Sequence, residues 1–281
     1  MAYLITGASG SVGRHIVAQL AAQGFSVHTF TRKPLTDPVP DNVRSFLGDL
    51  TSQNFSEELF NDVEGIFLFP AEGNLDSFLK EAKLRGVKKV VLLSSLAAAL
   101  EFPRDQNSVS AQHHLAIERS VIDSGLAFTI LRSGTFANNL RQWAYTIKMQ
   151  GMVFGPYPES AQALIHEADI ADVAVAALTS PEHAGAIYPL TGPEALTQLE
   201  QLKIIGTAIG KELTYQKITP EQFRQSMLQF VPEEIVKMLL DYWSDTEKTP
   251  DIVKNTVEEV TKKPARTLAQ WASDHAADFL S

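Results

Sequence analysis

Cysteine is absent from the 281 residues, so disulfide bonds, thiolate catalysis and cysteine-based zinc or iron–sulfur sites are excluded. Basic residues are few: 24 Lys and Arg stand against 33 Asp and Glu, which gives a net charge of −9. Because a nucleic-acid backbone needs a basic surface, we expect no direct nucleic-acid partner. Long apolar runs are missing too. The longest, 90–100, contains Ser94 and Ser95 and falls short of the ~20 residues of a membrane span, so we expect no membrane insertion.

The composition is that of a soluble globular protein, with 44% hydrophobic and 20% charged residues. The opening residues MAYLITG carry no basic segment and soon reach Gly7, a pattern typical of a buried strand and not of a signal peptide. A chain without cysteine suits a reducing compartment. We therefore expect a cytoplasmic location.

Short apolar runs alternate with helical patterns through the first half of the chain. The expected strands are 2–6, 25–30, 43–47, 65–69, 89–95 and 127–132. Helical patterns at 11–23, 72–85 and 110–124 lie between most of them. Because the runs are apolar throughout and joined by helices, they indicate parallel strands buried on both faces. The sequence predicts an α/β fold with a doubly wound parallel sheet of the Rossmann type.

The second half is richer in helical patterns and less regular. After an expected loop at 151–160, the patterns predict a helix at 169–179, a strand at 186–190, and helices at 194–209, 220–229, 232–243, 250–260 and 265–278. The pair Thr219-Pro220 is typical of a helix start. We expect a dinucleotide-binding Rossmann domain at 1–150, to which 163–192 returns. A smaller, mainly helical substrate-side domain would occupy 193–281.

Three glycines stand at three-residue spacing between the first strand and the first helix. In such a turn the first glycine allows the tight bend, the second lets the backbone approach a pyrophosphate, and the third permits close helix–strand packing. The helix N-terminus supplies unpaired N–H donors. The expected cofactor contacts are Thr6, Gly7, Ser9, Gly10, Ser11, Val12 and Gly13. The alternative is a glycine-rich turn that binds nothing.

The end of the second strand indicates which dinucleotide is bound. NAD sites usually carry an acidic residue there for the ribose hydroxyls, but this chain has Arg32 and Lys33. Arg32 can grip a 2′-phosphate with its forked guanidinium, and Lys33 can add charge. The sequence therefore favours NADP(H) over NAD(H), unless the two cations are only solvated surface residues.

Several further segments resemble one family, the atypical short-chain dehydrogenases/reductases of the NmrA-like type. Their order and spacing match over nearly the whole chain. The segments are GASGSVG (7–13), GDL (48–50), VVLLSS (90–95), SGLAFTILRSGTFANNL (124–140), HEADIADVAVAAL (166–178) and YPLTGPEALT (188–197). The resemblance implies an NADP(H)-binding Rossmann domain with a small substrate-side domain.

The resemblance also implies where the cofactor lies. Asp49 and Leu50 would flank the adenine, although an aspartate after a strand often only caps the next helix. Phe69 and Pro70 would begin a loop near the phosphates or ribose. The turn Ser133-Gly134-Thr135-Phe136 would lie against the nicotinamide. Ser94 closes a strand where this family often has a polar active-site residue, and helix capping explains it equally well.

Most short-chain dehydrogenases use a Tyr-x-x-x-Lys pair on the helix predicted here at 110–124. Aligning Glu118 with the glutamate that commonly follows this lysine places His114 at the lysine position and Ser110 at the tyrosine position. The catalytic pair is therefore absent. A serine hydroxyl holds its proton too tightly to replace the tyrosine as an acid.

His114 is the candidate for chemistry on this helix. At about 100° per residue, it falls with Glu118 in the apolar arc, whereas its neighbour His113 lies at the margin of that arc. We interpret the two histidines as unrelated, one interior and one marginal. His114 is either a core histidine, partnered for example by Glu118, or a residue that contacts the cofactor or substrate and could supply a proton.

Other polar and aromatic residues are weaker candidates. The expected substrate contacts are Asn138, Trp143 and Phe154, with packing between the two domains as an equally good explanation. The group His166, Glu167, Asp169 and Asp172 resembles a metal site on paper, but its spacing suits a helix start, so we expect no metal.

The combined pattern predicts an NADPH-dependent oxidoreductase that passes hydride to a small conjugated acceptor, such as a quinone, an enone or a dye. Such acceptors need little acid help, which fits the missing tyrosine and lysine. The alternative is a non-catalytic NADP(H)-binding redox sensor or regulator, and a weaker one is a nucleotide-sugar epimerase. The expected partner is a small-molecule substrate. A homodimer and a regulatory protein partner are both compatible with the sequence.

Overall fold

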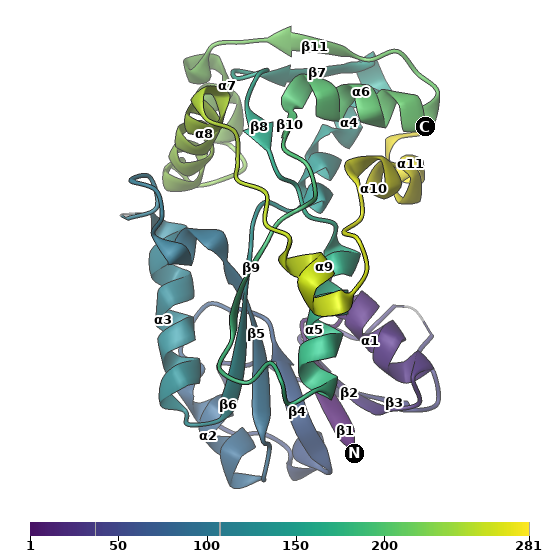
Figure 1. Ribbon diagram of the computed structural model, residues 1–281, viewed down its shortest axis with the longest axis vertical. Helices are drawn as coiled ribbons and strands as arrows, with labels where there is room; N and C mark the ends of the chain where they lie inside the picture. The colour runs from purple at the N-terminus through teal and green to yellow at the C-terminus, as the bar shows by residue number, and fades with distance from the viewer. Residues whose placement is uncertain (37, 107, 281) are drawn as a thin grey trace.

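A seven-stranded parallel sheet forms the lower half of the computed structural model, which describes residues 1–36, 38–106 and 108–280 (Figure 1). The strand order is β3-β2-β1-β4-β5-β6-β9, and every neighbouring pair is parallel. The strands are β1 (Ala2–Thr6), β2 (Ser26–Thr31), β3 (Val43–Leu47), β4 (Val63–Leu68), β5 (Lys89–Ser95), β6 (Ala127–Ser133) and β9 (Ile187–Leu190). This is the doubly wound Rossmann-type sheet that the sequence predicts.

Helices cover both faces of the sheet. Residues alternate between the faces along β1, so Tyr3 and Ile5 pack in one core while Ala2 and Leu4 pack in the other. The first core includes α1 (Gly13–Ala22), α5 (Glu167–Thr179) and α9 (Thr256–Thr261). The second includes α2 (Asp76–Leu84), α3 (Val109–Asp123) and the short helix η1 (Glu57–Phe60).

A second, mainly helical region stands above the carboxyl ends of the strands, at the top of Figure 1. One core there surrounds the fully buried Trp271, and a smaller one contains Phe223, Val236 and Trp243. Its elements are η3 (Ala137–Trp143), α4 (Ala144–Gln150), β7 (Met152–Gly155), β8 (Ala161–Gln162), β10 (Leu196–Thr197), α6 (Gln198–Ile209), β11 (Thr214–Lys217), α7 (Pro220–Met227), α8 (Glu233–Lys248), α10 (Leu268–Asp274) and α11 (Ala276–Phe279). Residues 137–155 thus join this upper region, while α9 returns to pack on α5 and β9.

The structure differs from the predicted elements in several places. The expected loop at 151–160 contains β7, which pairs with β11 far along the chain. The helix expected from 194 begins at Gln198, because Thr197 and Glu200 form a capping box. In the predicted helix 250–260 the helical part begins only at Thr256. The expected start at Thr219-Pro220 is confirmed by a capping box at α7. Among the described residues, no helix is long and apolar enough to cross a membrane.

Candidate active site

The turn between β1 and α1 has room only for glycine at two of its three glycine positions. Gly7 has a φ of +64°, and a Cβ there would lie 2.9 Å from Cβ of Phe69. A Cβ on Gly13 would lie 2.3 Å from the carbonyl oxygen of Gly7. At Gly10, by contrast, a Cβ would meet only the Gly7 carbonyl oxygen, at 3.1 Å, so this exposed position is open on its outer side.

Unpaired backbone donors collect at the start of α1. Val12, the N-cap residue, supplies no side-chain cap. Within the described chain, the N–H groups of Ser11, Val12 and Gly13 have no protein acceptor. The positive end of the helix dipole lies at the same place, so an anion is favoured here. Ser9 is exposed beside these donors. The turn at 7–13, called the glycine cradle below, and its free N–H groups therefore fit a pyrophosphate.

The cradle is fixed to the neighbouring strand by Thr6. Its buried hydroxyl donates to the carbonyl oxygen of Phe67 (3.0 Å) and accepts from the N–H of Phe69 (2.7 Å). These bonds hold the end of β4 against the end of β1. Phe69, whose side chain is 45% exposed, thereby covers Gly7. The loop from Phe69 thus lies beside the glycine turn.

Arg32, at the end of β2, lies close enough to Asp49 for its charge to act on that carboxylate. Arg32 and Lys33 are exposed, and the Thr31 hydroxyl donates to the Lys33 carbonyl oxygen (2.7 Å). Asp49 accepts from the backbone N–H (2.8 Å) and the hydroxyl (2.7 Å) of Thr51. These two hydrogen bonds, with a smaller contribution from the charge of Arg32, lower the pKa of Asp49. Leu50 beside it is buried.

The two adjacent histidines of α3 are not unrelated, so that interpretation is wrong. Their rings meet edge to face, with centroids 5.3 Å apart. Nε2 of His113 lies 3.3 Å from the carbonyl oxygen of Pro70, in the loop that the family resemblance puts near the phosphates or ribose. His113 therefore links α3 to this loop, a contact that a helical wheel cannot show.

Glu118 does not partner His114, contrary to one of the expected alternatives. The buried carboxylate of Glu118 accepts from the Ser94 hydroxyl (2.5 Å) and from Arg132 through both oxygens (3.0 and 2.6 Å). The buried Ser94 hydroxyl thus donates its proton to a protein carboxylate and not to a ligand. A carboxylate on α3 is bound to side chains of β5 and β6 because a buried charge requires a charged or hydrogen-bonding partner.

His114 is left with a buried nitrogen, Nδ1, that has no hydrogen-bond partner in the described chain. Burial lowers the pKa of His114 to about 4, with a smaller contribution from the neighbouring His113. The imidazole is therefore neutral at neutral pH, and it cannot supply the positive charge of the family's lysine. It can still donate or accept one hydrogen bond toward a ligand.

A cavity of about 640 Å³ lies between the carboxyl edge of the sheet and the upper region. The sheet side contributes Ser133, Gly134 and Thr135, the turn that the family resemblance places against the nicotinamide. Of the three predicted substrate residues, Trp143 lines the cavity. Among the described residues that line it, Asn138 and Phe154 do not occur; Phe154 is 37% exposed on β7. Phe136 packs against the sheet core below.

Tyr242 on α8 and Asp251 after it are among the residues of the cavity wall that sequence reasoning missed. The Thr135 hydroxyl donates to the Tyr242 oxygen (3.1 Å), and Tyr242 donates to Asp251, which also accepts from the Ala163 N–H (3.2 Å). Burial and the charge of Asp251 raise the pKa of Tyr242 well above its usual value. Tyr242 is thus a poor acid that holds α8 over the turn. Thr135 and Tyr242 are 107 residues apart, so no local signal reveals them.

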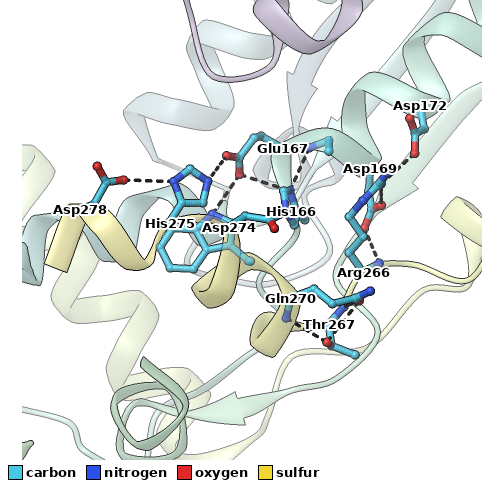
Figure 2. A network of polar contacts seen from close by, with 12 residues as sticks. His166, Glu167, Asp169, Asp172, Arg266, Thr267, Gln270, Asp274, His275 and Asp278 are labelled. Atoms are coloured by element: carbon cyan, nitrogen blue, oxygen red, sulfur yellow. Dashed lines mark hydrogen bonds and ion pairs between the residues drawn. The ribbon is translucent and has the colours of Figure 1, made fainter. Parts of the chain in front are cut away.

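The group His166, Glu167, Asp169 and Asp172 at the start of α5 contacts charged side chains of the C-terminal segment 266–275 (Figure 2). Glu167 is fully buried and accepts from Nε1 of Trp271 (3.1 Å) and Nε2 of His275 (2.7 Å). Arg266 pairs with the remaining two carboxylates, Asp169 and Asp172. His166 caps the helix by accepting from the Ala168 N–H (3.1 Å). Over 1–36, 38–106 and 108–280, no three such side chains are arranged to hold a metal ion.

A Rossmann sheet, a glycine cradle with free N–H donors and a cavity at the same edge of the sheet are typical of a dinucleotide-binding protein. The model of a family described as NAD(P)H-binding matches residues 7–181. The chain belongs to this family, within the atypical short-chain dehydrogenases/reductases of the NmrA-like type, as the sequence predicts.

Two relatives are similar over almost their full length. The (4-alkanoyl-5-oxo-2,5-dihydrofuran-3-yl)methyl phosphate reductase of Streptomyces griseus is 30% identical, with 98% of each chain covered. The NAD(P)H azoreductase of Xenophilus azovorans is also 30% identical, with 98% of each chain covered. Among solved structures, the NADPH-dependent quinone oxidoreductase of Escherichia coli complexed with NADPH shares the fold, with a TM-score of 0.76. It is 23% identical, covering 97% of this chain and 99% of that one.

Proposed function

We propose that the chain is an NADPH-dependent reductase that passes hydride to a small, conjugated acceptor of the quinone, enone or dye type. The observation that carries this proposal is a glycine cradle and a cavity at the same edge of the sheet, without the family's catalytic tyrosine and lysine on α3. Ser110 and His114 stand at the positions of the family's tyrosine and lysine, and His114 is neutral at neutral pH. Bound NADPH would supply the hydride.

The cofactor would lie along the carboxyl edge of the sheet. The free N–H groups of Ser11, Val12 and Gly13 would receive the pyrophosphate, and Arg32 with Lys33 would receive a 2′-phosphate. The unpartnered Nδ1 of His114 would bond the cofactor where other family members use lysine. The two cations at the end of β2 support the preference for NADPH over NADH.

The acceptor class follows from the proton supply. Tyr242, the phenol in the cavity wall, is bound to Asp251 and holds its proton tightly. A quinone, an enone or an azo compound delocalises the charge that hydride brings, so water can supply the proton afterwards. Orientation against aromatic and aliphatic walls, such as Trp143 and Met238, would then provide most of the catalysis. The activities for which the two relatives are named, reduction of a furanone and of azo compounds, support this class.

The test is an acceptor panel with purified protein. We expect oxidation of NADPH, and much slower oxidation of NADH, in the presence of a naphthoquinone, a cyclic enone or an azo dye. Gly10→Ala tests the phosphate site. Its methyl group would lie 3.1 Å from the Gly7 carbonyl oxygen and enter the phosphate site, so this variant should weaken NADPH binding by about ten-fold. NADPH binding without turnover of any acceptor would refute the proposal and favour the sensor alternative.

A further inference from the structure

Two buried polar atoms in the cavity wall have no hydrogen-bond partner within the described chain. They are Oε1 of Gln201 and Oγ of Ser133, and both residues line the cavity. Gln201 is 0% exposed and Ser133 3% exposed. Buried polar atoms are nearly always hydrogen bonded, because leaving one without a partner costs its full desolvation energy. The two atoms therefore indicate what the cavity binds.

The side-chain amide of Gln201 has a fixed orientation. Its Nε2 donates to the carbonyl oxygen of Leu196 (2.7 Å), and rotating the amide by half a turn would set two oxygens against each other. Oε1 is consequently a pure acceptor. Only a ligand or a water molecule that carries O–H or N–H can satisfy it.

Ser133 supplies the second atom from the other side of the cavity. It ends β6 in the sheet, immediately before Gly134 and Thr135, whereas Gln201 belongs to α6 in the upper region (Figure 1). Its hydroxyl can either donate or accept. The cavity thus lies between two regions that each contribute a lining residue with an unpartnered polar atom.

The charged residues of the wall argue against an anionic ligand. Three cations line the cavity, and each lies next to a carboxylate. The pairs are Arg104–Asp245 (3.3 Å), Lys237–Asp241 and Lys254–Glu101 (3.9 Å). A phosphate or carboxylate on the ligand would have to compete with a protein carboxylate for each of these cations.

We propose that the cavity selects an uncharged conjugated acceptor that carries a hydroxyl or N–H group, which donates to Oε1 of Gln201, while the Ser133 hydroxyl bonds a second polar atom of the same ligand. That the ligand accepts hydride rests on the proposed function, but the selection among ligands is a property of binding alone. It separates this chain from its relative in Streptomyces griseus, which is named for a phosphate ester.

The first experiment varies the ligand. Three 1,4-naphthoquinones differ only in a hydroxymethyl, an ethyl or a phosphomethyl substituent, so the first two have the same shape but only one has a donor. Trp143 and Trp243 line the cavity, and quenching of their fluorescence reports binding without turnover. We expect the hydroxymethyl compound to bind about ten-fold more tightly than the ethyl compound. The phosphomethyl compound should bind more weakly than both.

The second experiment varies the protein. Gln201→Met keeps the side-chain volume and removes the acceptor, so it should reduce the ten-fold preference to about two-fold or less. Gln198→Met is the matched control. Gln198 lies on the same helix and also lines the cavity, but its Oε1 already accepts from the Tyr215 hydroxyl (2.7 Å). This variant should keep the preference.

The outcomes separate this inference from the proposed function. Equal binding of the hydroxymethyl and ethyl compounds to the unmodified protein overturns the inference and assigns a water molecule to Gln201. This comparison is decisive even when Gln201→Met fails to fold. A retained preference without NADPH oxidation would refute the proposed function and leave the binding inference standing. NADPH oxidation that is equally fast with both compounds, together with equal binding, would do the reverse.

Discussion

Replacing His114 by leucine should make the fold less sensitive to acid. The ordinary pKa of a histidine is 6.5, and burial lowers the pKa of His114 to about 4. As pH falls below 6.5, the unfolded chain takes up a proton that the folded chain refuses until about pH 4. The stabilisation is therefore complete above pH 6.5 and is lost as pH falls toward 4.

The size of this effect follows from the two pKa values. At about pH 5 the unfolded chain gains about 2 kcal/mol over the folded chain from this one group, and the difference approaches about 3 kcal/mol below pH 4. Leucine has no proton to bind, and it leaves no buried Nδ1 without a partner. The variant should thus lose about 2 kcal/mol less than the original chain between about pH 8 and about pH 5.

Urea unfolding at the two pH values, followed by circular dichroism on protein freed of nucleotide, measures this difference. All other acid-sensitive groups are common to both proteins and cancel. His113→Gln is the control, because the His113 ring keeps a polar partner at Pro70, and this variant should retain most of the original pH dependence. Identical pH dependence in His114→Leu and the original chain would refute the idea that His114 is held neutral by burial.

Two further predictions concern the cofactor and the core. The double variant Arg32→Ala/Lys33→Ala should weaken NADPH binding by at least about ten-fold in titration calorimetry and leave NADH binding unchanged. Arg44→Ala, another exposed arginine, should change neither; loss of both cofactors in the double variant would contradict the assignment of these cations to the 2′-phosphate. Arg132→Met should lower the free energy of unfolding by about 3 kcal/mol, because Glu118 would stay buried without its cation. A change below about 1 kcal/mol in urea unfolding would contradict that account.

The sheet could be predicted from the sequence because each strand carries its own signal. The runs at 2–6 and 89–95 match β1 and β5 residue for residue, since apolar runs bounded by turn residues are recognisable locally. The run at 43–47 matches β3 as well, but this edge strand is largely exposed, so the expectation that every run is apolar and buried on both faces is wrong there. The strand β7 was not predictable in this way. Its four residues become a strand only because β11, about sixty residues further on, pairs with them.

The features on which the candidate cofactor site rests were visible in the sequence, because the glycine turn, the cations after β2 and the resemblance of the following segments are all sequence features. The substrate side was not. Trp143 lines the cavity, but Asn138 and Phe154 are absent from the described part of its lining. Tyr242 and Asp251 enter it from segments whose own patterns show only a helix and its end.

The sequence by itself determined the Rossmann sheet, the glycine cradle and the absence of the tyrosine and lysine at positions 110 and 114, since each depends on neighbours in the chain. The tertiary structure alone decided which buried charges form ion pairs and which buried polar atoms have no hydrogen-bond partner. Glu118 is bound by Ser94 and Arg132, so Nδ1 of His114 has no partner within the described residues, and burial keeps this imidazole neutral. Burial and pairing depend on segments far apart in the chain, and therefore only the folded molecule shows what the cavity can bind.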